Sequence, residues 1–247
     1  MGCRGVRFSI TAYAAWAPGV ETPASWLAWA IGTPAIAGHN EPQVSAMPPM
    51  LRRRAGFLGK MALEVAYQCL GPRTDVPTVF CSRHGEVSRS VDLLSDLARG
   101  VPLSPTTFGL SVHNAAGGLF SIARGDRANN IALAAGQSSV EHAVIEACGL
   151  LADGEPSVLL VAYDCPLPSV YAPFEDDHGQ AFAWAWLMQP AADDAISLTW
   201  SSAAAVPGAS GGKQRPAGLD VLRFHLRHDR ELQRVSDGRL WRWAHDA

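Results

Sequence analysis

The fold is decided by the stretch SVHNAAGGLFSIARGDRANNIALAAGQSSVEHAV, residues 111–144. Small residues at 114–123 predict a tightly packed helix, and the Gly-Asp pair that follows predicts the turn that ends it. The apolar run at 130–134 predicts a buried strand, and the serines at 138–139 are typical of a helix start. The bend between strand and helix resembles those that carry a nucleophile in α/β enzymes, but it holds Gln137, whose amide is not one.

Two more apolar runs, Val76–Cys81 and Ser157–Ala162, predict strands on either side of this stretch in the sequence. Helical segments separate these strands from Asn130–Ala134, which indicates right-handed crossovers and parallel pairing. We therefore predict an α/β fold with a mixed, mostly parallel sheet and helices on its faces. Ala181–Met188 and Ala195–Trp200 have no helix between them, so we expect them to pair as an antiparallel hairpin.

The rest of the chain is consistent with one domain over residues 1–247. Leu51–Leu70 has its apolar residues at helical spacing, and a Gly-Pro pair ends it. Residues 203–218 are rich in Ala, Gly, Ser and Pro, which predicts a flexible connection. Residues 219–247 are predicted to form a C-terminal helix and tail.

Composition excludes several classes of function. A hydrophobic fraction of 48%, a charged fraction of 17% and a net charge of −3 are ordinary for a globular protein and indicate no nucleic-acid partner. No apolar segment approaches the roughly 20 residues that span a bilayer, so we expect no membrane span. The five cysteines are widely spaced without a C-x-x-C pair, which favours reduced thiols in the cytoplasm.

Two enzyme interpretations remain open. Ser138, Asp164 and His178 occur in the order of an α/β-hydrolase triad, although Val140 replaces the final glycine of the Gly-x-Ser-x-Gly motif and Ser138 also suits a helix cap. The sequence Arg83-His84-Gly85-Glu86 after a strand is similar to the signature of histidine phosphatases, in which an arginine binds phosphate beside a histidine nucleophile.

A metal site has little support in the sequence. No H-x-x-x-H or H-E-x-x-H spacing occurs, and His225 and His228 are expected on the surface of a helix. We therefore predict no metal and no cofactor. Cys148 and Cys165 are expected to be inert thiols, since neither has an evident base nearby.

The order of motifs resembles the N-terminal half of β-ketoacyl synthases, from about Phe8 to Trp186. It is most similar to the short, chain-length-factor-like subunits of type II systems such as those that make aryl polyene pigments. The similar segments are FSITAYAAWAPG, MPP with LRRRAGFLGKMALEVAYQCL, SPTTF, SVHNAAGGLFSIARGDRANNIALAAG and the helix after Gln137. The resemblance implies half of a thiolase-like (ketoacyl synthase) fold.

The resemblance also implies that the chain is not a catalyst. Catalytic members carry the acylated cysteine where this chain has Gln137, and an amide cannot form the thioester. In catalytic members two further catalytic histidines lie in the C-terminal half of the fold. The resemblance covers only the N-terminal half, so we expect this chain to lack both histidines. The implied function is a subunit that forms a heterodimer with a full-length β-ketoacyl synthase and meets the acyl carrier protein through that complex. A subunit that decarboxylates malonyl carrier protein to make a primer is an alternative.

The resemblance places the working surface on the helix at 114–123 and the strand beside it, at the two-fold axis of the dimer. Residues expected at the interface and acyl tunnel are Val112, Asn114, Ala115, Ala116, Leu119 and Phe120. The basic run Arg52, Arg53 and Arg54 is a candidate docking surface for an acidic carrier protein, with a solvated face as the default.

Overall fold

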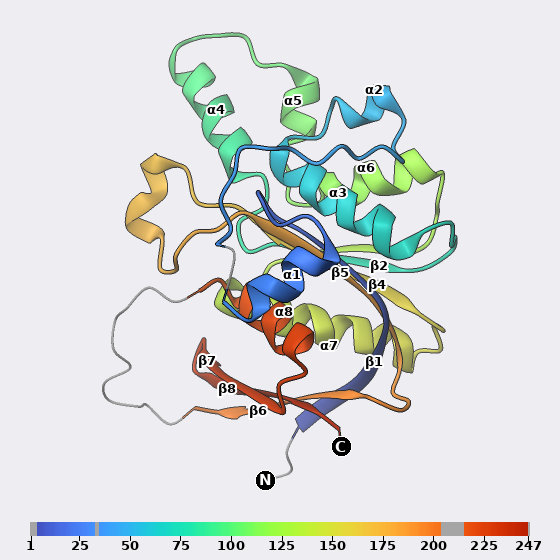
Figure 1. Ribbon diagram of the computed structural model, residues 1–247. Helices are drawn as coiled ribbons and strands as arrows, with labels where there is room; N and C mark the ends of the chain where they lie inside the picture. The colour runs from blue at the N-terminus through green and yellow to red at the C-terminus, as the bar shows by residue number, and fades with distance from the viewer. Residues whose placement is uncertain (1–3, 33–34, 204–214, 247) are drawn as a thin grey trace.

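The computed structural model describes residues 4–32, 35–203 and 215–246. Its centre is an eight-stranded sheet in the order β3-β2-β4-β5-β1-β6-β8-β7 (Figure 1). The strands are β1 (Arg4–Trp16), β2 (Thr78–Cys81), β3 (Asn130–Leu133), β4 (Val158–Asp164), β5 (Phe182–Pro190), β6 (Ile196–Ser202), β7 (Glu231–Ser236) and β8 (Arg239–His245).

Helices and two 3₁₀ turns connect the strands and cover both faces of the sheet. They are α1 (Pro23–Ala30), α2 (Pro49–Arg52), α3 (Phe57–Leu70), α4 (Val87–Ala98), α5 (Pro105–Gly109), α6 (Ala115–Arg124), η1 (Gly136–Ser138), α7 (Ser139–Ala152), η2 (Ser169–Phe174) and α8 (Ala217–Arg227). None of the helices in the described ranges is long and apolar enough to cross a bilayer.

The predicted α/β class is confirmed, whereas the prediction of a mostly parallel sheet is wrong. β2 pairs in parallel with β3 and β4, as the crossovers predicted. The remaining neighbours, from β4 through β5, β1, β6 and β8 to β7, all pair antiparallel. The parallel pairs belong to the segment in which helices connect the strands, and among the antiparallel pairs of the described strands only β7 and β8 are joined by a short turn.

The predicted hairpin of β5 and β6 does not form, because β1 lies between the two strands. The long β1 pairs with β5 from Phe8 to Trp16 and with β6 from Arg4 to Phe8. This pairing joins residues at opposite ends of the chain. Local alternation of apolar residues does not reveal such a partner.

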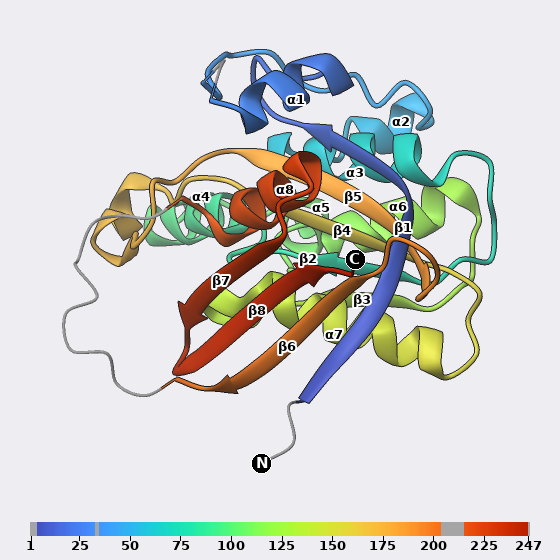
Figure 2. The same cartoon turned by 60° about the horizontal axis from the view of Figure 1, so that its bottom comes forward.

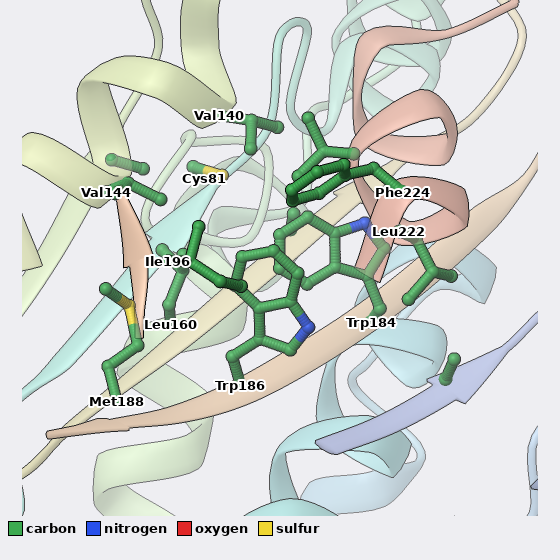
Figure 3. Close-up of a cluster of buried hydrophobic side chains, with 14 of the residues drawn as sticks. Cys81, Val140, Val144, Leu160, Trp184, Trp186, Met188, Ile196, Leu222 and Phe224 are labelled. Atoms are coloured by element: carbon green, nitrogen blue, oxygen red, sulfur yellow. The ribbon is translucent and has the colours of Figure 1, made fainter. Parts of the chain in front are cut away.

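The core has one layer on each face of the sheet. In β4, residues 158, 160 and 162 face a cluster built with α1, α7 and α8, and residues 159, 161 and 163 face a cluster built with α3 and α6. Trp184 and Trp186 of β5 are fully buried in the first cluster, with ring centroids 4.4 Å apart (Figure 3). The sheet therefore holds α6 and α7 on opposite faces.

The helix predicted over 51–70 is two helices. α2 ends at Arg52, and α3 begins after Gly56, which has an extended backbone and is the N-cap. The arginines at 52–54 therefore lie on α2 and the turn after it, not in the first turn of a long helix.

The predicted C-terminal helix and tail is also partly wrong. α8 ends at Arg227, and the residues after it form the β7–β8 hairpin, which extends the sheet past β6 (Figure 2). Trp241 and Trp243 of β8 are fully buried, so the hairpin covers α7. Most of the predicted flexible connection, residues 204–214, lies outside the described residues, and its last two residues already belong to α8.

Candidate functional site

The candidate site lies where the three parallel strands end. Ser82 follows β2, Asp164 ends β4, and Gln137 follows β3 on η1. Because the carboxyl ends of parallel strands meet at one edge of a sheet, these residues come together there. The bend before Gln137 needs a glycine, since Gly136 has a φ of +58°.

Asp164 organises the floor of the site. Its carboxylate accepts a hydrogen bond from the Ser82 hydroxyl at 2.7 Å and two from the backbone N–H of Arg83, at 3.0 and 3.1 Å. Burial raises the pKa of Asp164 to about 6, although the hydrogen bonds from Ser82 and the backbone oppose this shift. Asp164 therefore fixes the loop after β2 rather than presenting a free carboxylate.

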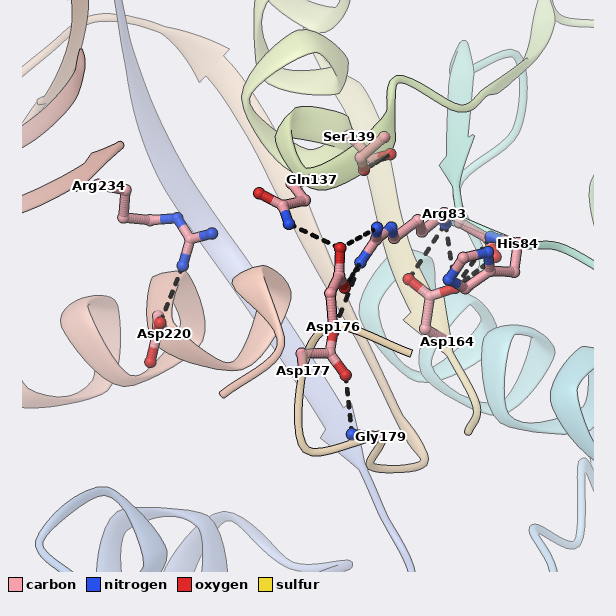
Figure 4. A network of polar contacts seen from close by, with 12 residues as sticks. Arg83, His84, Gln137, Ser139, Asp164, Asp176, Asp177, Gly179, Asp220 and Arg234 are labelled. Atoms are coloured by element: carbon pink, nitrogen blue, oxygen red, sulfur yellow. Dashed lines mark hydrogen bonds and ion pairs between the residues drawn. The ribbon is translucent and has the colours of Figure 1, made fainter. Parts of the chain in front are cut away.

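Gln137 is exposed and is held by an ion pair (Figure 4). Its Nε2 donates to Asp176 Oδ2 at 2.7 Å, and Asp176 also accepts two hydrogen bonds from the Arg83 guanidinium, at 2.5 and 2.8 Å. The hydrogen bond from Arg83 is the largest cause that lowers the pKa of Asp176 to about 2. The amide, the carboxylate and the guanidinium form one neutralised network, which we call the Gln137 network.

A cavity of about 250 Å³ adjoins the Gln137 network. On its far side Arg234 bonds the fully buried Glu141 at 3.2 Å and Asp220 at 2.8 Å. Burial raises the pKa of Glu141, although Arg234 opposes the shift. His84 is the one histidine among the described residues that line the cavity, and burial together with Arg83 lowers its pKa. The two arginines on opposite sides of the cavity, Arg83 and Arg234, are therefore both paired with carboxylates.

The hydrolase interpretation finds no triad in the described residues. Ser138 is fully buried, and its hydroxyl bonds Ser236 at 2.9 Å and Asp237 at 2.6 Å, so it fastens the β7–β8 hairpin to the start of α7. Asp164 is engaged by Ser82 and the backbone. His178 is exposed and is not a partner of the Ser138 hydroxyl.

The phosphatase interpretation requires an arginine that is free to bind phosphate. Arg83 instead makes a bidentate ion pair with Asp176. The backbone N–H of His84 approaches Asp164 at 3.4 Å, which keeps this residue in the structural loop after β2. The arrangement is better explained as a structural contact than as a phosphate site.

The thiols of the described cysteines are unreactive. Burial raises the pKa of Cys148 and of Cys165 to about 12, and Cys69 is shifted to the same value for the same reason. Burial also raises the pKa of Cys81. A thiol that stays protonated at neutral pH is a poor nucleophile, which agrees with the sequence prediction for Cys148 and Cys165.

The residues expected at the interface differ in exposure. Val112 is 43% exposed and Asn114 is exposed at the N-cap of α6, whereas the others are buried within this chain. The buried members are Ala115, Ala116, Leu119 and Phe120. Phe120 lies with its ring centroid 5.1 Å from that of Tyr67 and 5.8 Å from that of Phe80.

Helix α6 lies very close to β3. A Cβ on Gly117 would lie 2.5 Å from Asn130 Oδ1, and the Asn130 amide bonds the Gly117 carbonyl at 3.2 Å. Only glycine permits this approach. Helix α6 and edge strand β3 therefore form one joined surface.

The arginines at 52–54 do not enter the cavity. Arg52 is half-buried and lies near the Val44 carbonyl, while Arg53 and Arg54 are exposed. The structure therefore separates this basic run from the Gln137 network.

Sequence reasoning missed Asp176 and Arg234. Asp176 follows η2 in a loop with no periodic pattern, and Arg234 lies on a strand that was predicted as helix. The acidic pair Asp176-Asp177 was the only local signal that this loop could meet Arg83.

Solved structures place this architecture among ketosynthases. The ketosynthase ApeO in complex with its chain length factor ApeC, from Xenorhabdus doucetiae, matches at 27% identity and a TM-score of 0.84, covering 97% of this chain and 99% of that chain. The ishigamide ketosynthase/chain length factor matches at 16% identity and 0.62, covering 80% and 67%. A β-ketoacyl synthase from Burkholderia phymatum STM815 matches at 12% and 0.58, covering 84% and 66%.

Below 25% identity the last two matches establish the fold alone. Comparison with functionally characterised protein sequences gives no significant match. The family model described as the β-ketoacyl synthase N-terminal domain matches residues 26–244, which is most of the chain. The chain therefore belongs to the β-ketoacyl synthase N-terminal domain family.

Proposed function

We propose that the chain is a non-catalytic, chain-length-factor-like subunit that pairs with a full-length ketosynthase in the cytoplasm. In this role it helps to shape the acyl tunnel of its partner in type II polyketide biosynthesis of the aryl polyene kind. The observation that carries the proposal is Gln137 at the bend where catalytic members of the family have a cysteine. The likeness to a complex of ApeO with its chain length factor ApeC supports it.

The chemistry around Gln137 supports a non-catalytic role. An amide neither forms an acyl thioester nor acts as a base at neutral pH. The side chain is also engaged, since its Nε2 donates to Asp176. Replacing Gln137 by cysteine should not restore condensation, because catalytic members of the family also use two histidines, whereas His84 is the one histidine among the described residues that line the cavity.

The edge of the sheet at β3 supports pairing with another subunit. Among the described strands β3 pairs only with β2, so its second edge is open. Several exposed apolar side chains lie on α4, on α6 and on the segments around α5, and we take them as candidates for contacts with the partner. They are Leu94, Leu97, Val101, Leu103, Phe108, Val112 and Ile122.

The same surface supports a tunnel-shaping role. Val112 and Asn114 are exposed at the start of α6, where they can contact a partner, and buried Leu119 and Phe120 fix the position of the helix. Replacing Val112 by tryptophan would extend the surface toward the partner. We expect the reconstituted pair to make shorter acyl chains, and the exposed residue Ile31 on the opposite side of the sheet, replaced by tryptophan, serves as the control.

Arg53 and Arg54 remain our candidates for carrier-protein docking, because both are exposed on the same turn, beside half-buried Arg52. The double charge reversal to glutamate should slow acyl transfer from the carrier protein to the complex. Reversal of the exposed pair Arg99 and Arg230 makes the same change in net charge and serves as the control. Equal slowing by both double variants would assign the effect to net charge alone.

Co-expression with a full-length ketosynthase tests the function. The two chains should co-purify, and condensation should require the synthase's own cysteine but tolerate Gln137→Ala. Release of CO₂ from malonyl carrier protein by this chain alone would instead favour the primer-forming alternative. Hydrolysis of a simple ester or phosphate monoester by the isolated chain would favour a free-standing enzyme.

A further inference from the structure

Three side chains that lie far apart in the sequence meet at one point away from the cavity. Asp194 precedes β6, His228 is the C-cap residue after α8, and His245 ends β8. One carboxylate oxygen of Asp194 and one ring nitrogen of each histidine all lie within 4.8 Å of one another. Two imidazoles and a carboxylate are a donor set that suits zinc and related divalent transition ions.

The ring of His245 lacks hydrogen-bond partners. Its side chain is only 11% exposed, and neither ring nitrogen has a partner among the described residues. The nearest carboxylate oxygen, Oδ1 of Asp194, is 3.7 Å from Nδ1, which is too far for a hydrogen bond. Buried polar atoms are normally paired, so both ring nitrogens of His245 are available to a ligand or to water.

The backbone brings the other two donors to this point. Asp194 has a φ of +58° and His228 a φ of +48°, a left-handed conformation that is uncommon outside glycine. The Asp194 side chain is 72% exposed and His228 is exposed, so both can rotate. A tetrahedral ion with bonds near 2.0 Å requires donor separations of about 3.3 Å, so binding would need these side chains to rotate from their present separations of up to 4.8 Å.

A third histidine, His225, lies near the three donors. The ring centroid of His225 lies 6.1 Å from that of His228 and 6.5 Å from that of His245. Its Nδ1 is buried without a partner. His225 packs against Trp186, which corrects the sequence expectation that it lies on the surface.

We propose that Asp194, His228 and His245 bind one divalent transition ion of the zinc type, with a coordination position left open to water. The ion would tie together the segment before β6, the end of α8 and the end of β8. All three segments lie near the C-terminal part of the sheet, where α8 and the β7–β8 hairpin pack. The absence of a metal motif in the sequence is explained by the wide separation of the three donors.

The test uses the full chain without a polyhistidine tag, alone or in complex with its ketosynthase, after treatment with a chelator. Titration calorimetry with Zn²⁺ should give one ion per chain, and Co²⁺ should give visible absorption bands typical of four-coordinate binding. At a free Zn²⁺ concentration about 100-fold above Kd, the unfolding temperature should rise by roughly 5–10 °C.

His228→Ala and Asp194→Asn should each weaken Zn²⁺ binding by roughly tenfold or more. Both residues are exposed, so these variants are expected to fold even if His245→Ala does not. His39→Ala removes an exposed histidine outside the cluster and should leave binding unchanged. The proposal is overturned if the chain binds no Zn²⁺ above background, or if His228→Ala and Asp194→Asn bind it as tightly as the unaltered chain.

Discussion

Replacing Ala132 by proline should separate this chain from its ketosynthase partner without unfolding it. The carbonyls of Asn129 and Leu133 accept hydrogen bonds from the β2 side, from Thr78 and Ser82. Because peptide groups alternate along a strand, the N–H of Ala132 points away from β2, toward the open edge. Proline at this position removes no hydrogen bond of the chain's own sheet, and edge strands tolerate it there.

The size of the effect follows from the hydrogen bonds lost across the interface. Loss of the Ala132 N–H leaves one partner carbonyl buried and unpaired, which costs about 1–3 kcal/mol. The proline ring also holds the partner strand away and weakens a neighbouring hydrogen bond that is worth about 1 kcal/mol. The sum of about 2–4 kcal/mol weakens the complex roughly 30- to 700-fold.

The assay is the dissociation constant of the heterodimer, measured by surface-immobilised binding or by fluorescence. Ala132→Ser keeps the N–H and should bind like the unaltered chain. Circular dichroism should give matching spectra for the proline variant and the unaltered chain. If the proline variant is folded and binds its partner with an unchanged dissociation constant, the edge of β3 is not the pairing surface.

Three further predictions concern stability and charge. Phe120→Ala should cost about 3–5 kcal/mol in denaturant unfolding, because it empties a core site, whereas Val112→Ala at an exposed site should change stability by less than about 0.5 kcal/mol. Arg83→Ala should raise the pKa of Asp176, followed by NMR, from about 2 toward its ordinary value. The depressed pKa means that this ion pair stabilises the fold above about pH 4 and is lost as pH falls toward 2; an unchanged pKa would contradict the assignment. Burial raises the pKa of Asp164 to about 6, so the folded state retains a proton that the unfolded state releases near pH 4. The contribution of Asp164 to stability should therefore fall by roughly 2 kcal/mol between pH 4 and pH 7, and Asp164→Asn should flatten that slope in unfolding measured at both pH values.

The elements with local signals were predictable from the sequence. The three parallel strands follow from short apolar runs separated by helices, and the bend at Gln137 follows from the glycine before it. The position of β1 within the sheet was not predictable, because β1 pairs with residues 183–190 and 196–200, which lie far from it in the sequence. Pairing at such separation is set by the tertiary core and not by local pattern.

The C-terminal hairpin had a signal that the helix interpretation overlooked. An Asp-Gly pair between segments of alternating polar and apolar residues is typical of a two-residue hairpin turn. In the structure Asp237 and Gly238 both have a positive φ, of +50° and +71°. Because the C-terminal segment is also rich in basic residues, its composition resembled that of an exposed helix. The hairpin matters because it covers α7 with Trp241 and Trp243.

The candidate site was predictable only in part. The resemblance located Gln137, but the partners that hold it, Asp176 and Arg83, come from a loop and a strand end that the sequence does not relate. Leu119 and Phe120 were expected at the interface and acyl tunnel; both are buried in the core cluster beneath α6, and their role in a tunnel stays a prediction. A helix of small and apolar residues does not by itself reveal which face a neighbouring helix covers.

Native mass spectrometry of this chain co-expressed with an untagged full-length ketosynthase tests the central claim most directly. The proposed function predicts one dominant species that contains one copy of each chain, with the acyl group carried on the synthase. A synthase homodimer alongside this chain as a free monomer or a homodimer, or an acyl group bound to this chain, would contradict it.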